Sequence, residues 1–161
     1  MKILVISDSH GRTERLLRAI SYHPDAEYVL FLGDGHCDFD VAADRHRDKI
    51  FYAVRGNNDW SCDEPYVRII ELCGWRIMML HGHTAGVKHG ISNLLQSAAE
   101  NGCDAVLFGH THQPLERTEY VGDRRIYLFN PGSCAFGERT DTYGIITLDE
   151  KNILFSVGDI K

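Results

Sequence analysis

Five short apolar runs in the sequence are each followed at once by glycine and by aspartate, asparagine or histidine. These segments are Asp8-Ser9-His10-Gly11, Gly33-Asp34-Gly35-His36, Gly56-Asn57-Asn58-Asp59, His81-Gly82-His83 and Gly109-His110-Thr111-His112. Carboxylate oxygen combined with imidazole nitrogen suits Mn²⁺, Fe²⁺, Zn²⁺ or Mg²⁺. Any one of these segments would fit an ordinary turn, but five of them together predict a shared metal site.

The spacing within the segments is compatible with metal coordination. In extended backbone, residues i and i+2 point the same way, so Asp8 and His10 can face one ion, as can His110 and His112. The adjoining glycines allow tight turns and a close approach of the backbone to a ligand. The five cysteines are scattered and none ends such a run, which argues against a structural thiolate zinc site and favours ordinary thiols in a reducing compartment.

The apolar runs before these segments predict buried strands over residues 2–7, 28–32, 50–54, 76–80 and 105–108. Residues 12–23 and 91–101 predict helices, and a weaker helical pattern covers residues 39–47. Hairpin patterns over residues 66–80, 116–129 and 143–157 indicate that the second half is mostly antiparallel. We therefore expect an α/β fold of mixed sheets with helices outside, and a ligand beyond the carboxyl ends of the strands.

The chain has 161 residues, which is the length of one domain covering residues 1–161. A net charge of −6 argues against broad binding of nucleic acid, although a local positive centre could still bind a small anion. No uncharged apolar run approaches the ~18 residues of a membrane helix, and the start lacks a signal peptide. We expect a cytoplasmic protein with no membrane partner. An exposed edge strand or apolar patch could support a homo-oligomer.

In the order of its motifs, the chain resembles the calcineurin-like metallophosphoesterases. The matching motifs are Asp8-x-His10, Gly33-Asp34, Gly56-Asn57-x-Asp59, His81-Gly82-His83, Gly109-His110-x-His112 and Asn130-Pro131-Gly132-Ser133. The size of the chain and the motif without a histidine after Asn57 are similar to the small YfcE-type phosphodiesterases of bacteria and archaea. The resemblance implies a single metallophosphoesterase domain, built as a sandwich of two mixed β-sheets flanked by helices.

The resemblance also implies a two-metal centre. One ion would take Asp8, His10 and His112, the other would take Asn57, His81 and His110, and Asp34 would bridge both. Two such ions clamp a phosphoryl group and activate a bridging hydroxide for in-line attack. The expected ions are Mn²⁺, with Fe²⁺, Zn²⁺, Ni²⁺ and Mg²⁺ as alternatives. The implied activity is hydrolysis of a small phosphodiester, with weak action on monoesters, and the expected catalytic residues are Asp34, Asn57 and His81.

Asn58 stands where larger relatives carry a histidine that is thought to protonate the leaving group. A carboxamide cannot act as a general acid near neutral pH, so substrates with poor leaving groups should suffer most. Asn58, Arg55 and His83 are candidates for contact with the substrate. Arg55 could equally be a solvated arginine, and His83 could hold its loop. Asp59 could hydrogen-bond near a ligand or only cap a turn.

Two other functions fit a fold of this kind. One is a non-catalytic metal-binding scaffold that resembles a retromer subunit, in which the metal site is altered. The other is a nuclease of the same superfamily, which would carry the extra histidine and additional DNA-binding elements. All seven ligand positions here retain competent side chains, and the chain lacks the features of the nucleases. The sequence therefore favours a phosphodiesterase.

Overall fold

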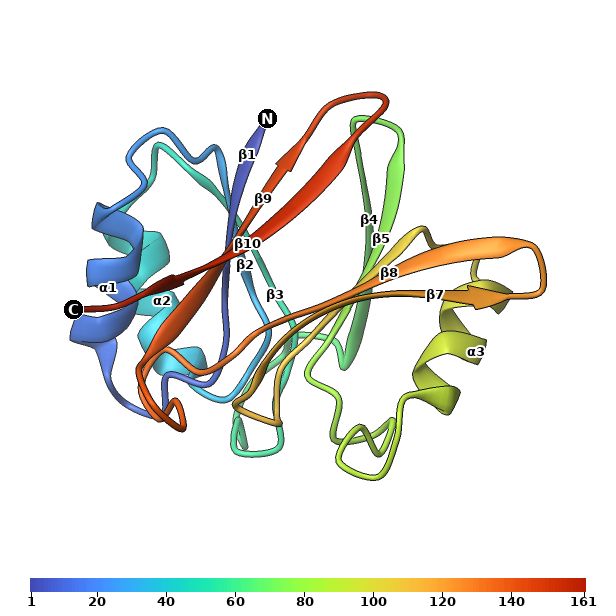
Figure 1. Cartoon of the computed structure of the whole chain (residues 1–161). Coiled ribbons are helices and arrows are strands. Elements are labelled where there is room, and N and C mark those ends of the chain that lie inside the picture. Colours follow the sequence, from blue (N-terminus) through green and yellow to red (C-terminus); the bar gives the residue numbers. More distant parts are fainter.

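Two mixed β-sheets of five strands each form the centre of the molecule, and a computed structural model describes all of residues 1–161. The first sheet has the strand order β10-β9-β1-β2-β3, and the second has the order β4-β5-β6-β8-β7. The first contains β1 (Lys2–Ile6), β2 (Tyr28–Phe31), β3 (Ile50–Ala53), β9 (Thr142–Leu148) and β10 (Ile153–Asp159). The second contains β4 (Val67–Leu72), β5 (Trp75–Leu80), β6 (Ala105–Phe108), β7 (Pro114–Val121) and β8 (Arg124–Pro131). Figure 1 shows the two sheets between flanking helices.

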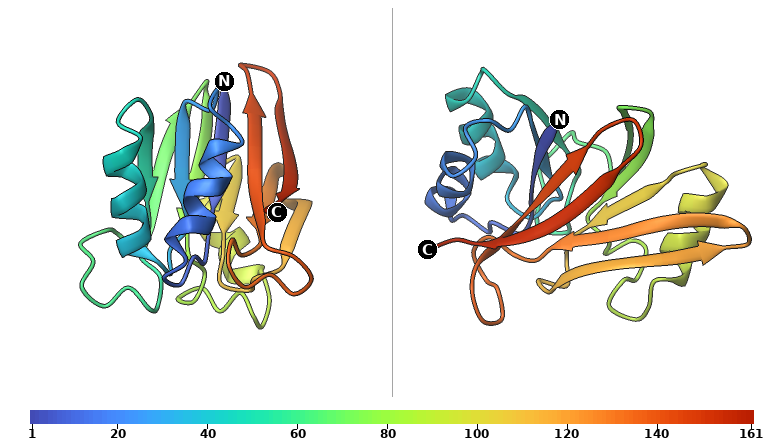
Figure 2. Two further views of the ribbon diagram at one scale, coloured as in Figure 1. Left: turned by 90° about the vertical axis from the view of Figure 1, so that its left-hand side faces the viewer. Right: turned by 45° about the horizontal axis from the view of Figure 1, so that its top comes forward.

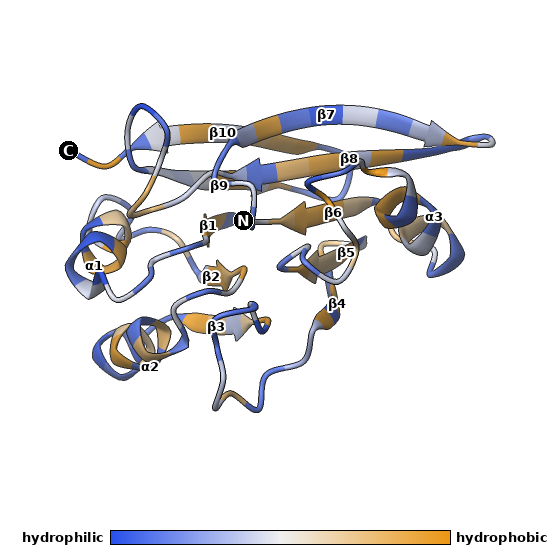
Figure 3. Ribbon diagram, turned by 90° about the horizontal axis from the view of Figure 1, so that it is seen from below, coloured by the Kyte–Doolittle hydropathy of each residue, from blue (hydrophilic) through white to orange (hydrophobic).

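The apolar core occupies three layers. Fully buried side chains such as Val5 and Leu30 of the first sheet meet Met79 and Leu107 of the second. A second cluster fills the space between the first sheet and two helices, α1 (Thr13–Ser21) and α2 (His36–Arg45), and a third lies under α3 (Ser92–Glu100). Figures 2 and 3 show α1 and α2 on one side of the sandwich and α3 on the other. None of the helices is long and apolar enough to span a membrane.

Parallel pairing brings the ends of the apolar runs together. Strands β1, β2 and β3 are parallel neighbours in the first sheet, and β5 and β6 are parallel neighbours in the second. Parallel strands end at the same edge of their sheet, so the segments that follow them must lie side by side. Figure 3 looks at the sandwich from below, toward the side on which β1, β2 and β6 end in Figure 1.

The predicted mixed sheets with outer helices are confirmed, with two differences in detail. The second half contains more parallel pairing than predicted, because β6 lies parallel to both β5 and β8. Hairpin patterns report only strands that are adjacent in sequence, whereas α3 carries the chain over to β6. In addition, α2 starts at His36 rather than at residue 39. Its first turn is polar and contacts the neighbouring loops, so it carries no apolar periodicity.

Candidate metal centre

Backbone hydrogen bonds continue beyond the strands into the predicted ligand segments. The N–H of Asp8 donates to the carbonyl of Gly33, and the N–H of His10 donates to the carbonyl of Asp34, each at 3.0 Å. In the second sheet, the N–H of Gly109 donates to the carbonyl of His81 at 3.0 Å. These bonds hold neighbouring segments in register, so the side chains of the segments converge between the two sheets.

Most of the predicted ligands have a strained backbone. The φ angles are positive at residues that normally avoid the left-handed region, namely Asp8 (58°), His10 (45°), Asp34 (60°), His110 (66°) and His112 (59°). Each such conformation costs of the order of 1–3 kcal/mol and persists only where the surroundings enforce it. The concentration of strain in one place marks this region as a functional site.

Two glycines allow the segments to approach each other closely. A Cβ atom at Gly56 would lie 2.1 Å from Oδ1 of Asp34, and one at Gly109 would lie 2.0 Å from Oγ of Ser7. Neither neighbour is free to move, because Asp34 and Ser7 are themselves buried. Glycine is therefore required at both positions if the carboxylates are to keep their places.

The first group of donor atoms surrounds Asp8, whose side chain is fully buried. Its Oδ1 atom lies 3.1 Å from Nε2 of His112 and 3.7 Å from Nε2 of His10. The two Nε2 atoms of His10 and His112 face each other at 3.3 Å. Asp8, His10 and His112 thus have the spacing of ligands to one ion.

The second group surrounds His81, which comes from the other sheet. Nε2 of His81 lies 3.1 Å from Oδ1 of Asn57, 3.2 Å from Nδ1 of His110 and 3.4 Å from Oδ2 of Asp34. Nδ1 of His81 lies 2.8 Å from the carbonyl of Leu32, which can only accept a hydrogen bond. Nδ1 therefore carries the proton, and the lone pair of Nε2 points into the group.

Asp34 lies between the two groups of donor atoms. Its Oδ2 atom is 3.4 Å from Nε2 of His81 and 3.8 Å from Nε2 of His10. The structure therefore brings together all seven predicted ligands, and Asp34 faces histidines of both groups. Oδ1 of Asp8 also lies 3.9 Å from Nε2 of His81, so the two groups adjoin closely. This arrangement has the layout of a site for two ions that share one ligand.

Divalent metal ions fit these residues. Oδ1 of Asp8 is buried and has no hydrogen-bond partner, although a buried carboxylate oxygen normally has one. Several neighbouring nitrogen and oxygen atoms also face one another at about 3 Å. A cation between them would satisfy the unpaired oxygen and could take these atoms as its ligands.

The charges of the two carboxylates depend on the surrounding imidazoles. Burial alone would raise the pKa of Asp8, but the facing imidazoles of His10 and His112 lower it well below its usual range. Burial likewise acts to raise the pKa of Asp34, but His81 and Asn58 bring it down to about 2. Both carboxylates are therefore ionised at neutral pH, as ligands of a divalent ion must be.

The histidines differ in their protonation. The carboxylate of Asp8 raises the pKa of His10; burial opposes a charge on His81, yet Asp34 and Asp8 raise its pKa as well. By contrast, burial and the positive charges of His81 and Lys88 lower the pKa of His110 to about 4. His110 is therefore neutral and able to coordinate at neutral pH, whereas protons compete more strongly with a metal ion for His10 and His81.

Asp59 holds the loop that carries Asp34. Its carboxylate accepts hydrogen bonds from the backbone N–H groups of Asp34, Gly35, His36 and Gly56 at 2.8 to 2.9 Å. The carboxylate is buried, and these four bonds satisfy it. Of the two roles considered for Asp59, the structure shows the capping role, because all four donors are backbone N–H groups and two of them, those of Gly35 and His36, begin α2. The capped loop is the one that carries Asp34, so Asp59 also fixes the backbone of this ligand.

Asp38 has a similar function for the first segment, and sequence reasoning missed it. Its carboxylate accepts hydrogen bonds from Oγ of Ser9 at 2.6 Å, from the N–H of Gly11 at 2.8 Å and from Oγ1 of Thr13. On the opposite side, Oγ of Ser133 donates to the carbonyl of Asp8 at 2.8 Å. The motif that includes Ser133 was visible in the sequence, whereas an aspartate within a helix gave no signal.

The three residues predicted to contact the substrate lie around the site, and each has different neighbours. Asn58 donates from its backbone N–H and from Nδ2 to the carboxylate of Asp34, at 2.8 and 2.6 Å. Arg55 lies over the ring of Tyr66 and donates to the carbonyl of Trp60. The ring of His83 lies 5.4 Å from that of His81. Asn58 therefore orients a ligand, and Arg55 is held by its own loop.

Comparisons with known proteins agree with this geometry. The model of the calcineurin-like phosphoesterase superfamily domain matches residues 1–152. A probable metallophosphoesterase of Bacillus subtilis, YsnB, is 34% identical over 152 residues, covering 92% of this chain and 85% of its own.

Solved structures share the fold at lower identity. A predicted phosphoesterase from Streptococcus pneumoniae superimposes with a TM-score of 0.80 at 24% identity, covering 98% of this chain and 88% of its own. Vps29 from Chaetomium thermophilum has a TM-score of 0.74 at 20% identity, with coverage of 97% and 87%. A structure described as a novel archaeal phosphodiesterase has a TM-score of 0.72 at 24% identity, with coverage of 98% and 99%.

The stabilisation of the protein by metal should increase with pH. Below the ordinary histidine pKa of ~6.5, protonated His10 and His81 stabilise the metal-free fold through Asp8 and Asp34. As the pH rises through their raised pKa values, this contribution is lost and the neutral imidazoles become available to metal. The increase in melting temperature caused by Mn²⁺ should be several degrees larger at pH 8 than at pH 6. His10→Ala should remove the increase, and the exposed His89→Ala should keep it; an increase that is independent of pH would contradict this account.

Removal of the charge of Asp59 should weaken metal binding. In Asp59→Asn, an amide N–H₂ group would face backbone donors that now meet a carboxylate oxygen. We expect metal affinity to fall about 10- to 100-fold, and the free energy of unfolding to fall by about 2 kcal/mol. Calorimetric titration with Mn²⁺ and urea unfolding measure the two effects. Asp63→Asn, an exposed aspartate of the same loop, is the matched control; equal behaviour of the two variants would remove the role given to Asp59.

Proposed function

The chain belongs to the calcineurin-like phosphoesterase superfamily, and we propose that it is a phosphodiesterase that uses two divalent metal ions. The observation that carries this proposal is the convergence of two carboxylates and three histidines, Asp8, Asp34, His10, His81 and His112, around a buried carboxylate oxygen without a partner, with Asn57 and His110 beside His81. Three of these donors, Asp34, Asn57 and His81, surround the place where both groups meet. We propose them as the residues nearest to the reaction.

When bound, divalent ions would supply Lewis-acid stabilisation of the phosphoryl oxygens and an acidified water as the nucleophile. The residues of this chain prepare the site for that chemistry. Asp8 and Asp34 stay ionised because their pKa values are lowered, and the Leu32 carbonyl fixes the tautomer of His81. Asn58 restrains the Asp34 carboxylate from the solvent side. The ligands are therefore oriented before substrate arrives, which lowers the cost of reorganisation during reaction.

The expected dependence on the leaving group rests on the absence of a protein group that can protonate the leaving oxygen, whereas the preference for diesters rests on the resemblance to the small phosphodiesterases. Asn58 has no acidic proton, and its amide is engaged by Asp34. Burial and the charge of His81 lower the pKa of His83, so this histidine is neutral at neutral pH and a poor proton donor for this purpose. Arg55 and His83 could still contact the substrate, as donors of hydrogen bonds rather than of protons.

A scaffold function is the alternative, because Vps29 shares this fold. A fold alone does not decide between an enzyme and a binding module. The intact donor set and the strained backbone at the ligands favour an enzyme, because neither is required for a passive surface. A protein that binds two metal ions and hydrolyses no phosphoester would support the scaffold instead.

Manganese is the metal that we propose for this site. Four histidine side chains, those of His10, His81, His110 and His112, contribute to the two groups alongside carboxylate and amide oxygens. A mixture of nitrogen and oxygen donors suits Mn²⁺, Fe²⁺, Ni²⁺ or Zn²⁺ better than Mg²⁺, which prefers oxygen. Availability of the metal then selects among these ions.

Removal of metal should abolish activity on bis(p-nitrophenyl) phosphate. Treatment with a chelator, followed by gel filtration, should leave less than about 1% of kcat, and Mn²⁺ should restore activity at least as well as Mg²⁺. Asp34→Asn should lower kcat/KM more than about 100-fold, because this residue faces both groups. Asp63→Asn is the control and should retain full activity. Full activity of the chelated protein would refute the proposal.

The rate should depend steeply on the leaving group. Without a general acid, p-nitrophenyl diesters should be cleaved at least about 100-fold faster than alkyl diesters. Asn58→His should flatten this dependence by helping poor leaving groups most, and Asn58→Ala is its matched control, since both variants lose the Nδ2 bond to Asp34. The measurement is kcat/KM across a series of substituted phenyl and alkyl diesters. A shallow dependence in the parent protein would show that another residue supplies the proton.

A further inference from the structure

The largest cavity of the protein lies next to the metal centre, and the chemistry described so far does not use it. It has a volume of about 460 Å³ and lies between the β5–α3 loop and the β6–β7 loop. Ligand pockets of proteins usually measure about 300 to 1,000 Å³. Resting on the proposed function, we propose that this cavity binds an uncharged aromatic or similarly apolar substituent of the phosphodiester while the phosphoryl group lies at the metal centre.

Two segments that carry predicted metal ligands also bound the cavity. Thr111 lines the cavity and lies between the ligands His110 and His112, and Phe108 precedes this segment at the end of β6. On the opposite wall, Val87 packs so closely on Gly82 that a Cβ atom there would lie 2.8 Å from Cγ2 of Val87. Gly82 follows His81 directly, so each wall belongs to a segment that holds a ligand. This placement of the cavity beside both segments is the observation from which the subsite is inferred.

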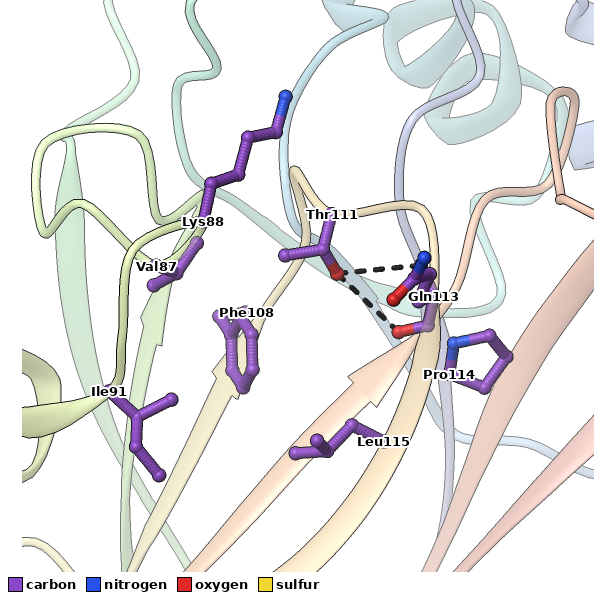
Figure 4. A pocket seen from close by; sticks show the side chains of 8 residues that line it. All are labelled: Val87, Lys88, Ile91, Phe108, Thr111, Gln113, Pro114 and Leu115. Carbon is purple, nitrogen blue, oxygen red and sulfur yellow. Dashed lines mark hydrogen bonds between the residues drawn. The ribbon is translucent and has the colours of Figure 1, made fainter.

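The floor of the cavity is apolar. Figure 4 shows the side chains of Val87, Ile91, Phe108 and Leu115 around the cavity, with the ring of Phe108 between the other side chains. Phe108 and Val87 are almost fully buried, which makes this part of the wall rigid, whereas Ile91 and Leu115 are half-buried. Such a surface favours a ring or a hydrocarbon group. A charged substituent would lose its water on entering the cavity, which costs a large free energy of desolvation.

Polar groups stand at the rim, on the side of the metal ligands. Oγ1 of Thr111 lies 3.1 Å from Nδ2 of Asn130, which fixes its position. The Lys88 side chain lines the cavity and points away from the apolar floor in Figure 4, so its positive charge stands at the rim. A substrate with an anionic phosphoryl group outside the cavity and an uncharged substituent on the floor would suit this distribution of charge.

This arrangement predicts a preference among substrates. A diester with an aromatic substituent would use both the metal centre and the cavity, whereas a methyl ester or inorganic phosphate would use only the metal centre. The cavity would therefore favour diesters of aromatic alcohols, independently of the chemistry of the leaving group.

The test uses binding as well as turnover. Phenylphosphonate and methylphosphonate, which are not hydrolysed, are titrated calorimetrically into the Mn²⁺-loaded protein. We expect the parent protein to bind phenylphosphonate about tenfold more tightly. Ile91→Trp should fill the cavity and remove this preference while methylphosphonate binding changes less than about twofold. Ile91 makes no capping hydrogen bond to α3, so the larger side chain breaks no such contact. Leu115→Trp is a second filling variant in case Ile91→Trp does not fold.

The control and the possible outcomes separate this inference from the proposed function. Leu154→Trp, on exposed strand β10, adds the same ring far from the cavity and should keep the preference. Loss of the preference in the filled variant supports the cavity as a subsite, even if the parent protein cleaves no diester. A preference that survives filling, or that is absent in the parent, overturns the subsite even if diesters are cleaved. In an active parent, kcat/KM for bis(p-nitrophenyl) phosphate should also fall about tenfold in Ile91→Trp.

Discussion

Two buried carboxylates, those of Asp8 and Asp34, impose the constraint on which the surrounding structure depends. An ionised group in an apolar interior is very costly unless positive charge and hydrogen bonds compensate it. Asp8 accepts bonds from Ser7 and from the N–H of His110, and Asp34 accepts them from Asn58. These donors come from both sheets. The requirement to compensate two charges therefore joins the sheets at this edge, and the Oδ1 atom that no protein group satisfies defines where a cation belongs.

Burial of the apolar core stabilises the fold and so offsets the backbone strain at this edge. Three buried clusters on either side of and between the sheets hold the strands in place without any contribution from the ligand loops. The loops can then be held in left-handed conformations by Asp38 and Asp59. Asp59 binds four backbone N–H groups, and Asp38 binds one backbone N–H group and two hydroxyl groups. A carboxylate that collects several N–H donors fixes a backbone more firmly than packing does, because each bond is directional. The buried strands thus stabilise the fold, and the strained loops position the metal ligands.

The sequence allowed the strands and a shared metal site at their ends to be predicted because both depend on local patterns, whereas the assignment of individual ligands to two ions came from the resemblance to a known family. A buried parallel strand is a short apolar run, and its end is where glycine, aspartate or histidine appears. The supporting residues could not be predicted in the same way. Asp59 is 25 residues from Asp34 in the chain, and Asp38 is 27 residues from Gly11, so their contacts exist only after the sheet forms. The cavity is likewise made by two loops whose residues, such as Lys88 and Gln113, show no common pattern. The sequence showed only that Asn58 stands in place of a histidine that could donate a proton. Its hydrogen bonds to Asp34 form only when the loop is folded and could not be predicted.

The strand order of the first sheet has a consequence for the synthesis of the protein. Strand β1 lies between β2 and β9, and Ser133 and Cys134 bind the segment that follows β1. A chain that leaves the ribosome from its N-terminus therefore exposes Asp8 and His10 early, while the strand that must cover β1 has not yet been translated. His112 joins them only after two-thirds of the chain has been made, and β9 only near the end. Each group of donor atoms is therefore complete only when segments from both halves of the chain have folded together, which couples metal binding to the folding of the whole domain.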